Sequence, residues 1–348
     1  MPGVAVIGAG YWGPNLIRNF MGSQDWDLRY VCDLDEDRAR RVLGRYSTVE
    51  VTSDFDRILD DPTVHAVAIA TPANTHFGLA SAALDAGRHV LVEKPLAATA
   101  AEAEKLVELA EARDRVLMCD HTYCYTPAVR KIRELVHSGE LGEIQYIDSV
   151  RINLGLIQHD IDVIWDLAPH DLSILDSVLP EDRRITAVAA HGADPVGAGR
   201  ACVAYLTLPL EGGAIAHAHV NWLSPTKIRQ MIIGGSSKML VWDDLSTTQR
   251  LSLYDKGVDL EASMSPERRT DTLVSYRLGE MVAPALVERE ALGGVVAEFA
   301  ASIGEHRAPL TDGRSGLRVI RVLDAASRSL AGGGSLTALP VERSAGRV

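Results

Sequence analysis

A glycine-rich turn near the start of the chain limits the folds open to it more than any other feature. The short apolar run at residues 4–7 predicts a β-strand, and residues 12–21 have the spacing of an amphipathic helix. Three glycines in a G-x-G-x-x-G pattern lie between the two. In this context the first permits a tight turn, the second lets the backbone approach a pyrophosphate, and the third lets the helix pack on the strand. We therefore expect a dinucleotide at this turn, contacted by Gly8, Gly10, Tyr11, Trp12 and Gly13.

Strand and helix patterns alternate through the first third of the chain. Further strands are predicted at residues 28–32, 64–70, 89–92 and 116–119, and further helices at residues 35–44, 75–86 and 99–113. Short strands that are apolar throughout are typical of a parallel sheet covered by helices on both faces. We expect residues 1–122 to form a doubly wound α/β (Rossmann) domain that binds a dinucleotide.

Asp33 follows the second predicted strand, twenty residues after Gly13. A carboxylate at this position accepts hydrogen bonds from ribose hydroxyls and repels a 2′-phosphate, which favours NAD over NADP as the cofactor. Asp35 is open to two interpretations. It shares this role, or it caps the helix that begins at Glu36, and capping is the interpretation we favour.

Two more segments follow strands of this sheet, at the edge where open α/β folds bind ligands. A lysine between an apolar strand and a proline, as at Lys94, is placed to point at a ligand, and a cis peptide at Pro95 would fix that turn. His76 either contacts the cofactor or only begins a helix. We predict cofactor contacts at Thr71, Pro72, Asn74, His76, Glu93 and Lys94.

The pattern changes after residue 122. Strands with partial alternation are predicted at residues 143–153, 202–208, 214–222, 227–233, 239–243 and 250–254, and helices at about 161–179, 286–306 and 315–330. Consecutive strands of this kind indicate a largely antiparallel open sheet with one exposed face. We expect an α+β domain for substrate binding and oligomerisation at residues 123–332, followed by a flexible tail at residues 333–348.

Asp166 and His170 are four residues apart on the first of these helices, so they share one face. Oxidation of an alcohol by hydride loss requires removal of the hydroxyl proton near neutral pH, for which histidine is suited. The carboxylate orients the imidazole or binds a neighbouring hydroxyl, and Lys94 stabilises negative charge on the reacting oxygen. The alternative is a surface Asp–His pair worth about 0.3 kcal/mol. The catalytic interpretation requires Lys94 and His170 to converge on one carbon beside the nicotinamide.

The glycine loop, the T-P-x-x-x-H segment at 71–76 and Glu93-Lys94-Pro95 resemble the glucose–fructose oxidoreductase/inositol dehydrogenase/rhizopine catabolism (Gfo/Idh/MocA) family of sugar dehydrogenases. The resemblance continues at 125–142, 165–171 and 310–313, and covers roughly residues 3–332. It implies catalysis by Lys94, Asp166 and His170, and a homodimer or homotetramer formed through the open sheet.

The stretch from Asn153 to His170 most resembles the branch of the family that oxidises or reduces C3 of a UDP- or dTDP-linked sugar. A diphosphate substrate requires positive groups, which Arg151, Lys227 or Arg229 would supply. An inositol or free-sugar dehydrogenase is the alternative, and a non-catalytic dinucleotide-binding sensor is a remote one. The predicted substrate contacts are Tyr123, Arg151, Asn153 and His159.

Other polar residues are interpreted structurally. His217 and His219 lie two residues apart on one strand, so their side chains are on the same face of the sheet. We expect them to be a facing pair in the sheet, and no metal is predicted. Asp160 is expected to cap the helix that carries Asp166. For Tyr123, aromatic packing at the junction between domains is the alternative to substrate contact.

Composition excludes several classes of partner. The chain of 348 residues has 47 acidic and 35 basic residues, for a net charge of −12, so binding to nucleic acid is not expected. No apolar run reaches the ~18 residues of a membrane span, and the start of the chain does not resemble a signal peptide. The four cysteines form no C-x-x-C pair, which is typical of reduced thiols. We expect a cytoplasmic enzyme.

Overall fold

A computed structural model describes residues 1–44, 47–159, 161–261 and 273–340. The chain divides into two compact units. The first unit contains residues 1–127, 172–177 and 288–324, and the second contains residues 128–171, 178–287 and 325–348. The predicted boundary at residue 122 remains a proposal about domains. By packing, residues 288–324 cluster with the first unit, although the sequence pattern placed them in the second domain.

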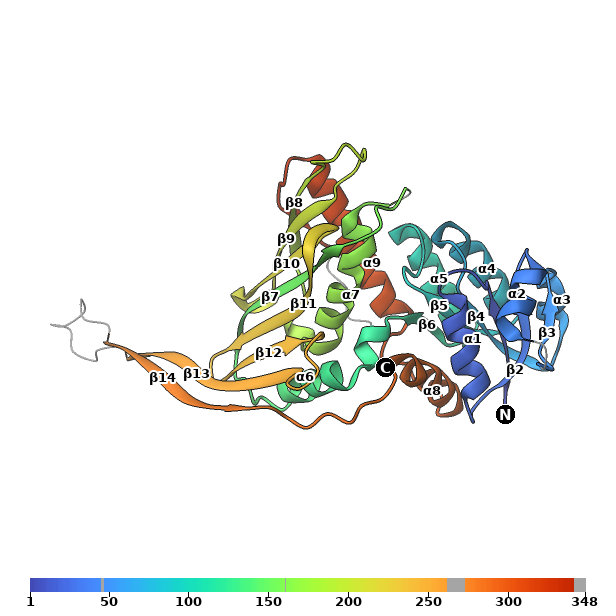
Figure 1. Cartoon of the computed structure of the whole chain (residues 1–348), viewed down its shortest axis with the longest axis horizontal. Coiled ribbons are helices and arrows are strands. Elements are labelled where there is room, and N and C mark those ends of the chain that lie inside the picture. The colour runs from blue at the N-terminus through green and yellow to red at the C-terminus, as the bar shows by residue number, and fades with distance from the viewer. Residues whose placement is uncertain (45–46, 160, 262–272, 341–348) are drawn as a thin grey trace. The chain divides into compact units, whose positions relative to one another are not determined.

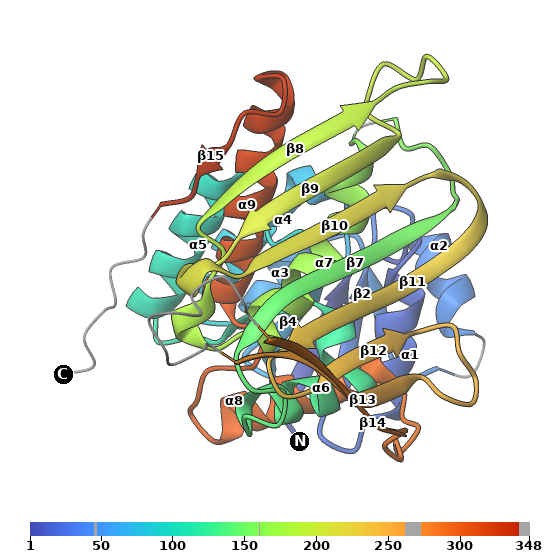
Figure 2. The ribbon, with the colours of Figure 1, turned by 90° about the vertical axis from the view of Figure 1, so that its left-hand side faces the viewer.

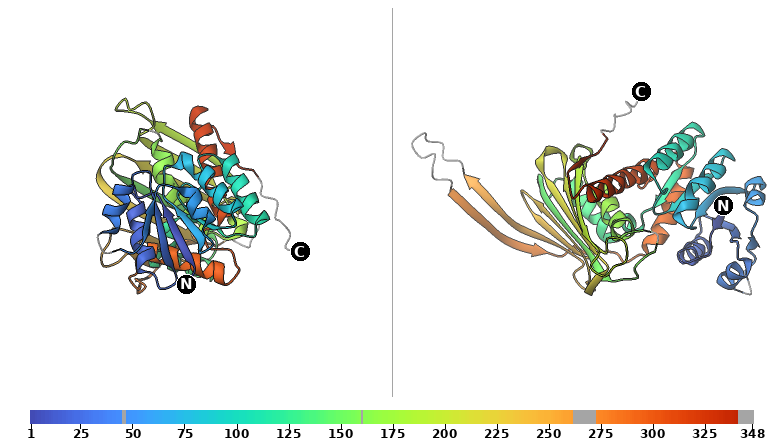
Figure 3. Two further views of the ribbon diagram at one scale, coloured as in Figure 1. Left: turned by 90° about the vertical axis from the view of Figure 1, so that its right-hand side faces the viewer. Right: turned by 90° about the horizontal axis from the view of Figure 1, so that it is seen from above.

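The first unit is built on a six-stranded parallel sheet in the order β3-β2-β1-β4-β5-β6 (Figure 1). Its strands are β1 (Gly3–Ile7), β2 (Asp27–Cys32), β3 (Glu50–Thr52), β4 (Val64–Ile69), β5 (His89–Glu93) and β6 (Leu117–Asp120). Its helices include α1 (Gly13–Gly22), α2 (Glu36–Leu43), α3 (Phe55–Asp60), α4 (Ala73–Asp85) and α5 (Ala100–Ala112), followed by a 3₁₀ turn η1 (Thr122–Tyr125). Every residue of β1 is buried, because helices lie on both faces of the sheet (Figure 3, left).

Aromatic packing explains why α8 (Ala291–Gly304) belongs to this unit. The ring of Phe299 stacks on Trp26 with centroids 5.2 Å apart, and Phe20 of α1 meets the same indole edge-on at 5.8 Å. The indole Nε1 of Trp26 donates to the carbonyl of Val296 at 3.0 Å. A helix far along the sequence thus completes the core beside α1, and sequence periodicity cannot reveal such a contact.

The second unit contains a nine-stranded sheet in the order β14-β13-β12-β11-β7-β10-β9-β8-β15. Among the strand pairs of the described residues, only β7 and β10 run parallel, so the expected mixed and largely antiparallel sheet is confirmed. The strands are β7 (Ile144–Leu154), β8 (Ala187–Ala193), β9 (Val203–Pro209), β10 (Ile215–Asn221), β11 (Leu223–Gly235), β12 (Met239–Asp243), β13 (Leu251–Glu261), β14 (Leu273–Val282) and β15 (Thr337–Ala338).

One face of this sheet is covered by helices and the other is not. The remaining elements are α6 (Pro127–His137), α7 (Val163–Val178), η2 (Glu181–Arg183), η3 (Glu211–Gly213) and α9 (Gly313–Ala331). The Oγ of Ser329 in α9 accepts from the backbone N–H of Ala190 in β8 at 2.8 Å, which ties the helix to the covered face. Figure 2 faces the other side of the sheet, over which no described helix lies.

Several sequence predictions need correction here. Strands β3, β8 and β14 and helix α3 were not predicted. Part of the predicted flexible tail is held by the sheet, because Thr337–Ala338 pairs with β8 and the N–H of Leu339 donates to the carbonyl of Thr186 at 2.9 Å. Asp160 lies outside the described residues. The carboxylate of Asp162 accepts from the N–H groups of Ile164 and Trp165, both at 3.0 Å, at the start of α7.

No helix in the described part of the chain is both long enough and apolar enough to cross a membrane. All four cysteines are buried free thiols, which agrees with the expectation of reduced cysteines.

Candidate active site

The glycine loop between β1 and α1 has the steric requirements predicted for it. Gly8 has a φ of +99°, and a Cβ there would lie 2.7 Å from the carbonyl oxygen of Ala70. A Cβ at Gly13 would lie 2.1 Å from the carbonyl oxygen of Gly8, so only glycine lets α1 begin this close to the strand. A Cβ at Gly10 would meet nothing within 4 Å, so the backbone there is open to a ligand.

Asp33 fastens this loop to the end of β2. Its Oδ2 accepts the N–H of Ala9 at 2.7 Å, and its Oδ1 accepts the N–H of Asp35 at 2.8 Å. Only 9% of the side chain is exposed. Each carboxylate oxygen has a second lone pair, so both remain able to accept from ribose hydroxyls.

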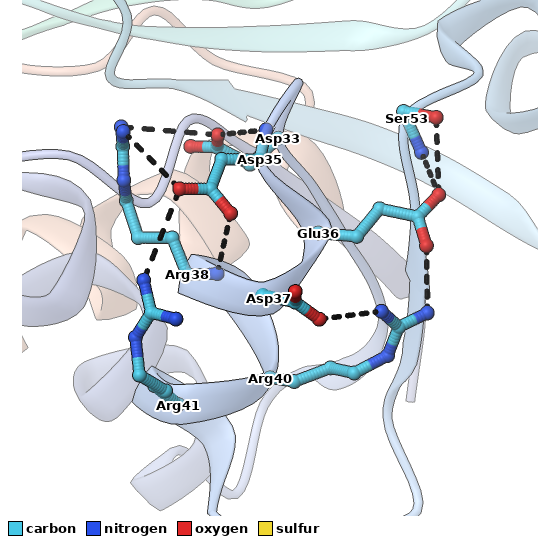
Figure 4. Close-up of polar contacts among 8 residues, drawn as sticks. All are labelled: Asp33, Asp35, Glu36, Asp37, Arg38, Arg40, Arg41 and Ser53. Carbon is cyan, nitrogen blue, oxygen red and sulfur yellow. Dashed lines mark hydrogen bonds and ion pairs between the residues drawn. The ribbon is translucent and has the colours of Figure 1, made fainter.

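Charged residues at the start of α2 lie beside Asp33 (Figure 4). Asp35 caps the helix by accepting the N–H of Arg38 at 3.0 Å, which confirms capping as its role. The guanidinium of Arg38 lies 3.9 Å from Oδ1 of Asp33 and 3.5 Å from Oδ2 of Asp35, and Arg41 lies 3.8 Å from the same oxygen of Asp35. A pocket of about 670 Å³ is lined by Asp37, Arg40, Arg41, Leu43, Gly44, Ser47, Val49 and Val51.

His76 joins the two loops that follow β4 and β5. Its Nδ1 lies 2.8 Å from the carbonyl oxygen of Pro95 and its Nε2 lies 2.8 Å from that of Thr71. The ring is 1% exposed, and burial lowers its pKa. Both nitrogens therefore face protein carbonyls, and contact between His76 and a cofactor remains a prediction. Thr71 also hydrogen-bonds Thr75 at 2.6 Å.

The segment after β5 contains a cis peptide between Lys94 and Pro95, as the sequence predicted. Beneath it, burial and the neighbouring Asp120 raise the pKa of Glu93 well above its usual range. The indole Nε1 of Trp12, in the glycine loop, donates to Oδ2 of Asp120 at 3.1 Å. Lys94, Glu93 and the glycine loop are thus held together at the carboxyl ends of the strands of one unit.

The other predicted catalytic residues lie on α7, in the second unit. Asp166 accepts a hydrogen bond at its Oδ2 from the indole Nε1 of Trp222 at 2.9 Å. Trp222 is 1% exposed and lies between β10 and β11, so a buried sheet residue orients this carboxylate. His170 is half-buried one turn later on the helix. Convergence of His170 with Lys94 on one carbon stays a prediction.

Arg151 is committed to a buried ion pair. Its Nε donates to Oδ2 of Asp171 at 2.8 Å and its Nη2 donates to Oδ1 at 3.0 Å, while Ser149 also donates to Oδ1 at 2.9 Å. Both charged side chains are 3% exposed. These contacts assign Arg151 the role of fixing α7 to β7, and its predicted contact with substrate remains untested.

The remaining predicted residues differ in exposure. Tyr11 is 96% exposed, and Pro72, Asn74 and His159 are also exposed, whereas Tyr123 and Asn153 are half-buried. Three residues that contact the candidate site were not predicted: Asp120, Asp171 and Trp222. Asp120 directly follows a strand, so its position at the ligand-binding edge was a usable signal. Trp222 gave no signal in the sequence, because it bonds to Asp166, which is 56 residues away in the chain.

Comparison with known proteins places these features in a family. Residues 3–121 match the model of an oxidoreductase family with an NAD-binding Rossmann fold, and residues 129–241 match the GFO/IDH/MocA C-terminal domain. The chain belongs to the Gfo/Idh/MocA family. It is therefore an oxidoreductase with an NAD-binding domain, and the resemblance stated from the motifs is confirmed.

The chain is similar along almost its whole length to UDP-N-acetylglucosamine 3-dehydrogenase from Acidithiobacillus ferrooxidans. The two are 29% identical over 319 residues, which is 90% of this chain and 93% of the relative. The solved structure of that enzyme covers 96% of this chain and 99% of its own, with a TM-score of 0.78 and 26% identity.

Two other proteins that are similar to this chain have different names. GenD2 from gentamicin A biosynthesis, solved in complex with NAD, has a TM-score of 0.79 at 25% identity and covers 97% of this chain and 96% of its own. Myo-inositol 2-dehydrogenase from Thermotoga maritima is 26% identical over 222 residues, or 61% of this chain and 66% of the relative.

The residues of the glycine loop fit NAD. The open space over Gly10 suits a pyrophosphate, and the buried carboxylate of Asp33 suits the ribose hydroxyls.

Proposed function

We propose that the protein is an NAD-dependent dehydrogenase or ketoreductase that acts on the C3 hydroxyl of a nucleotide-linked sugar. The similarity to UDP-N-acetylglucosamine 3-dehydrogenase over 90% of the chain carries this proposal. The catalytic residue types at Lys94, Asp166 and His170 support it, because they suit removal of a hydride and a proton from an alcohol.

NAD held by the glycine loop and Asp33 would supply an acceptor for the hydride that the sugar carbon loses. His170 takes the hydroxyl proton, so the C–H and O–H bonds break as the C=O bond forms. Lys94 donates a hydrogen bond to the reacting oxygen and stabilises its developing negative charge. Asp166, held by Trp222, orients the imidazole or binds an adjacent hydroxyl. Reduction of a ketone is the same step reversed.

The guanidinium of Arg151 is bound to Asp171, which offsets its charge and makes it less suited to bind a diphosphate than a cation without such a pair. Arg229 has Asp244 at 3.6 Å, which offsets its charge. Lys227 is exposed at the start of β11 and is the strongest remaining candidate. We propose that it contributes to binding the diphosphate.

A panel of substrates tests the proposal. Purified protein with NAD is mixed with UDP-N-acetylglucosamine, a dTDP-sugar or myo-inositol, and the nicotinamide absorbance is followed. The proposal predicts turnover of a nucleotide sugar and none of myo-inositol. Turnover of myo-inositol alone would favour the second candidate, an inositol dehydrogenase, which the Thermotoga maritima relative supports. NAD binding without any turnover would favour a sensor.

We also propose a homodimer or homotetramer formed through the uncovered face of the larger sheet. Apolar side chains lie exposed on this face, including Tyr205, Ile215 and Ile228, which are 45%, 48% and 36% exposed. Sedimentation of the variants Tyr205→Arg and Ile228→Asp tests this, with smaller species than wild type expected. Unchanged sedimentation would contradict it. We further propose that the enzyme is cytoplasmic, which its four buried free thiols support.

A further inference from the structure

Glu93 and Asp120 place two carboxyl groups side by side inside the first unit. They are register partners at the ends of the adjacent parallel strands β5 and β6, so their side chains point to the same face of the sheet. The two carboxyl groups hydrogen-bond each other. Asp120 is 1% exposed, and Oε2 of Glu93 is buried. Two buried negative charges in this arrangement repel strongly, so a shared proton is favoured.

The hydrogen-bond donors around the pair are unequal. Oδ1 of Asp120 accepts from Oγ1 of Thr122 at 2.7 Å, and Oδ2 accepts from Nε1 of Trp12 at 3.1 Å. Glu93 receives a backbone hydrogen bond from Lys94, but its Oε2 has no donor within the part of the chain that the structure describes. Donors stabilise an ionised carboxylate. Asp120 is therefore suited to hold the charge and Glu93 to hold the proton.

We infer that Glu93 is a neutral carboxylic acid that donates a hydrogen bond to ionised Asp120, and that the pair thereby positions Trp12. The pair then carries one negative charge, which interacts favourably with the positive charge of Lys94. Cys119 and His121, the neighbours of Asp120 in the chain, are neutral at pH 7. Burial raises the pKa of the Cys119 thiol well above its usual range, and burial lowers the pKa of His121 to about 4.

The Glu93–Asp120 pair is linked to the glycine loop of the proposed cofactor site. Trp12 immediately precedes α1, so its bond to Asp120 ties the glycine loop to the end of β6. Glu93 acts on that loop through Asp120, so in this role it is a positioning residue. The effect of Glu93 on catalysis rests on the proposed function of the protein, whereas the protonation state of Glu93 does not.

The proton is located directly by ¹³C NMR of protein labelled at the glutamate carboxyl carbons. At neutral pH we expect one signal at the shift of a neutral acid, absent from Glu93→Gln and retained in the matched control Glu108→Gln. Glu108 is an exposed residue of α5. If every glutamate signal were that of an ionised carboxylate, the inference would be overturned. This readout needs neither substrate nor turnover, so it is independent of the proposed function.

Stability against pH provides a second readout. A group whose pKa is raised in the folded state takes up a proton on folding, so its contribution to stability declines as pH rises above its ordinary pKa, 4.5 here. The unfolding constant of wild type should rise relative to that of Glu93→Gln by about tenfold per pH unit in that range. The assignment would be contradicted if the ratio of the two unfolding constants did not change with pH. It would also be contradicted if Asp120→Asn removed the pH dependence of stability and Glu93→Gln did not.

The positioning role is read from the indole ¹⁵N–H signal of Trp12, assigned with Trp12→Phe. Glu93→Ala removes the donor to Asp120, so the signal should shift, whereas Glu93→Gln keeps a donor and should hold the signal near its wild-type position. An unmoved Trp12 signal in Glu93→Ala would mean that Glu93 does not position the loop.

Discussion

The indole of Trp222 donates a hydrogen bond to the carboxylate of Asp166 across 2.9 Å, from a side chain that is 1% exposed. The tryptophan follows β10, and the aspartate lies on α7 one turn before His170. A rigid sheet residue therefore fixes the rotamer of a carboxylate that the proposed reaction uses. Buried, charge-assisted hydrogen bonds of this kind contribute about 1.5–3 kcal/mol.

Trp222→Phe removes this donor and keeps most of the packing. We expect kcat/KM for the sugar to fall by about 10- to 100-fold, as the loss of such a bond implies, while the dissociation constant for NAD stays unchanged. Trp165→Phe is the matched control, because its indole donates to neutral Ser327 at 2.9 Å from the same helix. Steady-state kinetics and NAD titrations make the comparison. Equal losses in both variants would mean that the bond to Asp166 has no special role.

Arg151→Met breaks the buried pair with Asp171 and leaves a buried charge without its partner. We expect the free energy of unfolding to fall by about 3–5 kcal/mol. The control is Arg113→Met, which breaks an exposed pair with Asp85 and should cost less than about 1 kcal/mol. Denaturant unfolding measures both. A stable Arg151→Met protein with a raised KM for the sugar would instead support the sequence prediction that Arg151 contacts substrate.

The sequence predicted the glycine loop and the turn at Lys94 well, because their chemistry is local. A Cβ at Gly13 would clash with Gly8 in the same turn, and a Cβ at Gly8 would clash with Ala70 just after the adjacent strand. The cis bond directly precedes Pro95. Strand β3 was missed because it has three residues, too few for periodicity to appear. The partners of Arg151 and Asp166 could not be found, because they depend on how strands and helices pack.

Asp33→Ala removes the charge that repels a 2′-phosphate. We expect the preference for NAD over NADP to fall, and NAD binding itself to weaken, since the N–H of Ala9 loses its acceptor. Asp35→Ala is the control, because it removes the cap of α2 and the exposed ion pairs with Arg38 and Arg41 but leaves Asp33 in place. It should cost about 1 kcal/mol of stability without removing the preference for NAD. Fluorescence titration with each dinucleotide measures this. If the preference survives in Asp33→Ala, another residue selects the cofactor.

The thiols should be unreactive in the folded protein. Burial raises the pKa of Cys32 to about 11 and that of Cys124 to about 12, and it also raises the pKa of Cys119 and Cys202. Since the thiolate is the reactive form, alkylation of Cys32 and Cys124 at neutral pH should be at least about 100-fold slower than that of a free cysteine, and alkylation of Cys119 and Cys202 should also be slowed. Mass spectrometry after iodoacetamide treatment measures this, with all four labelled after denaturation. Rapid labelling of the native protein would contradict the buried environments.

The larger sheet shows a second limit to what the sequence can predict. Alternation along β9 and β10 correctly indicated one exposed face, and His219 stacks on Tyr205 there at 4.4 Å, as expected for a facing residue in a sheet. The long ribbon of β13 and β14 was not predicted beyond residue 254. Leu278 and Tyr276 are 80% and 72% exposed on it, so burial leaves no pattern there for sequence reasoning to use.

The central claim is that Lys94 and His170 act on the same hydroxyl group. Its most direct test is the initial rate of nicotinamide reduction with UDP-N-acetylglucosamine in wild type, Lys94→Ala and His170→Ala, each checked for folding by circular dichroism. Loss of a group that transfers a proton or stabilises charge should lower kcat by about 10²- to 10⁴-fold in each variant. Rates equal to wild type in either folded variant would contradict the claim.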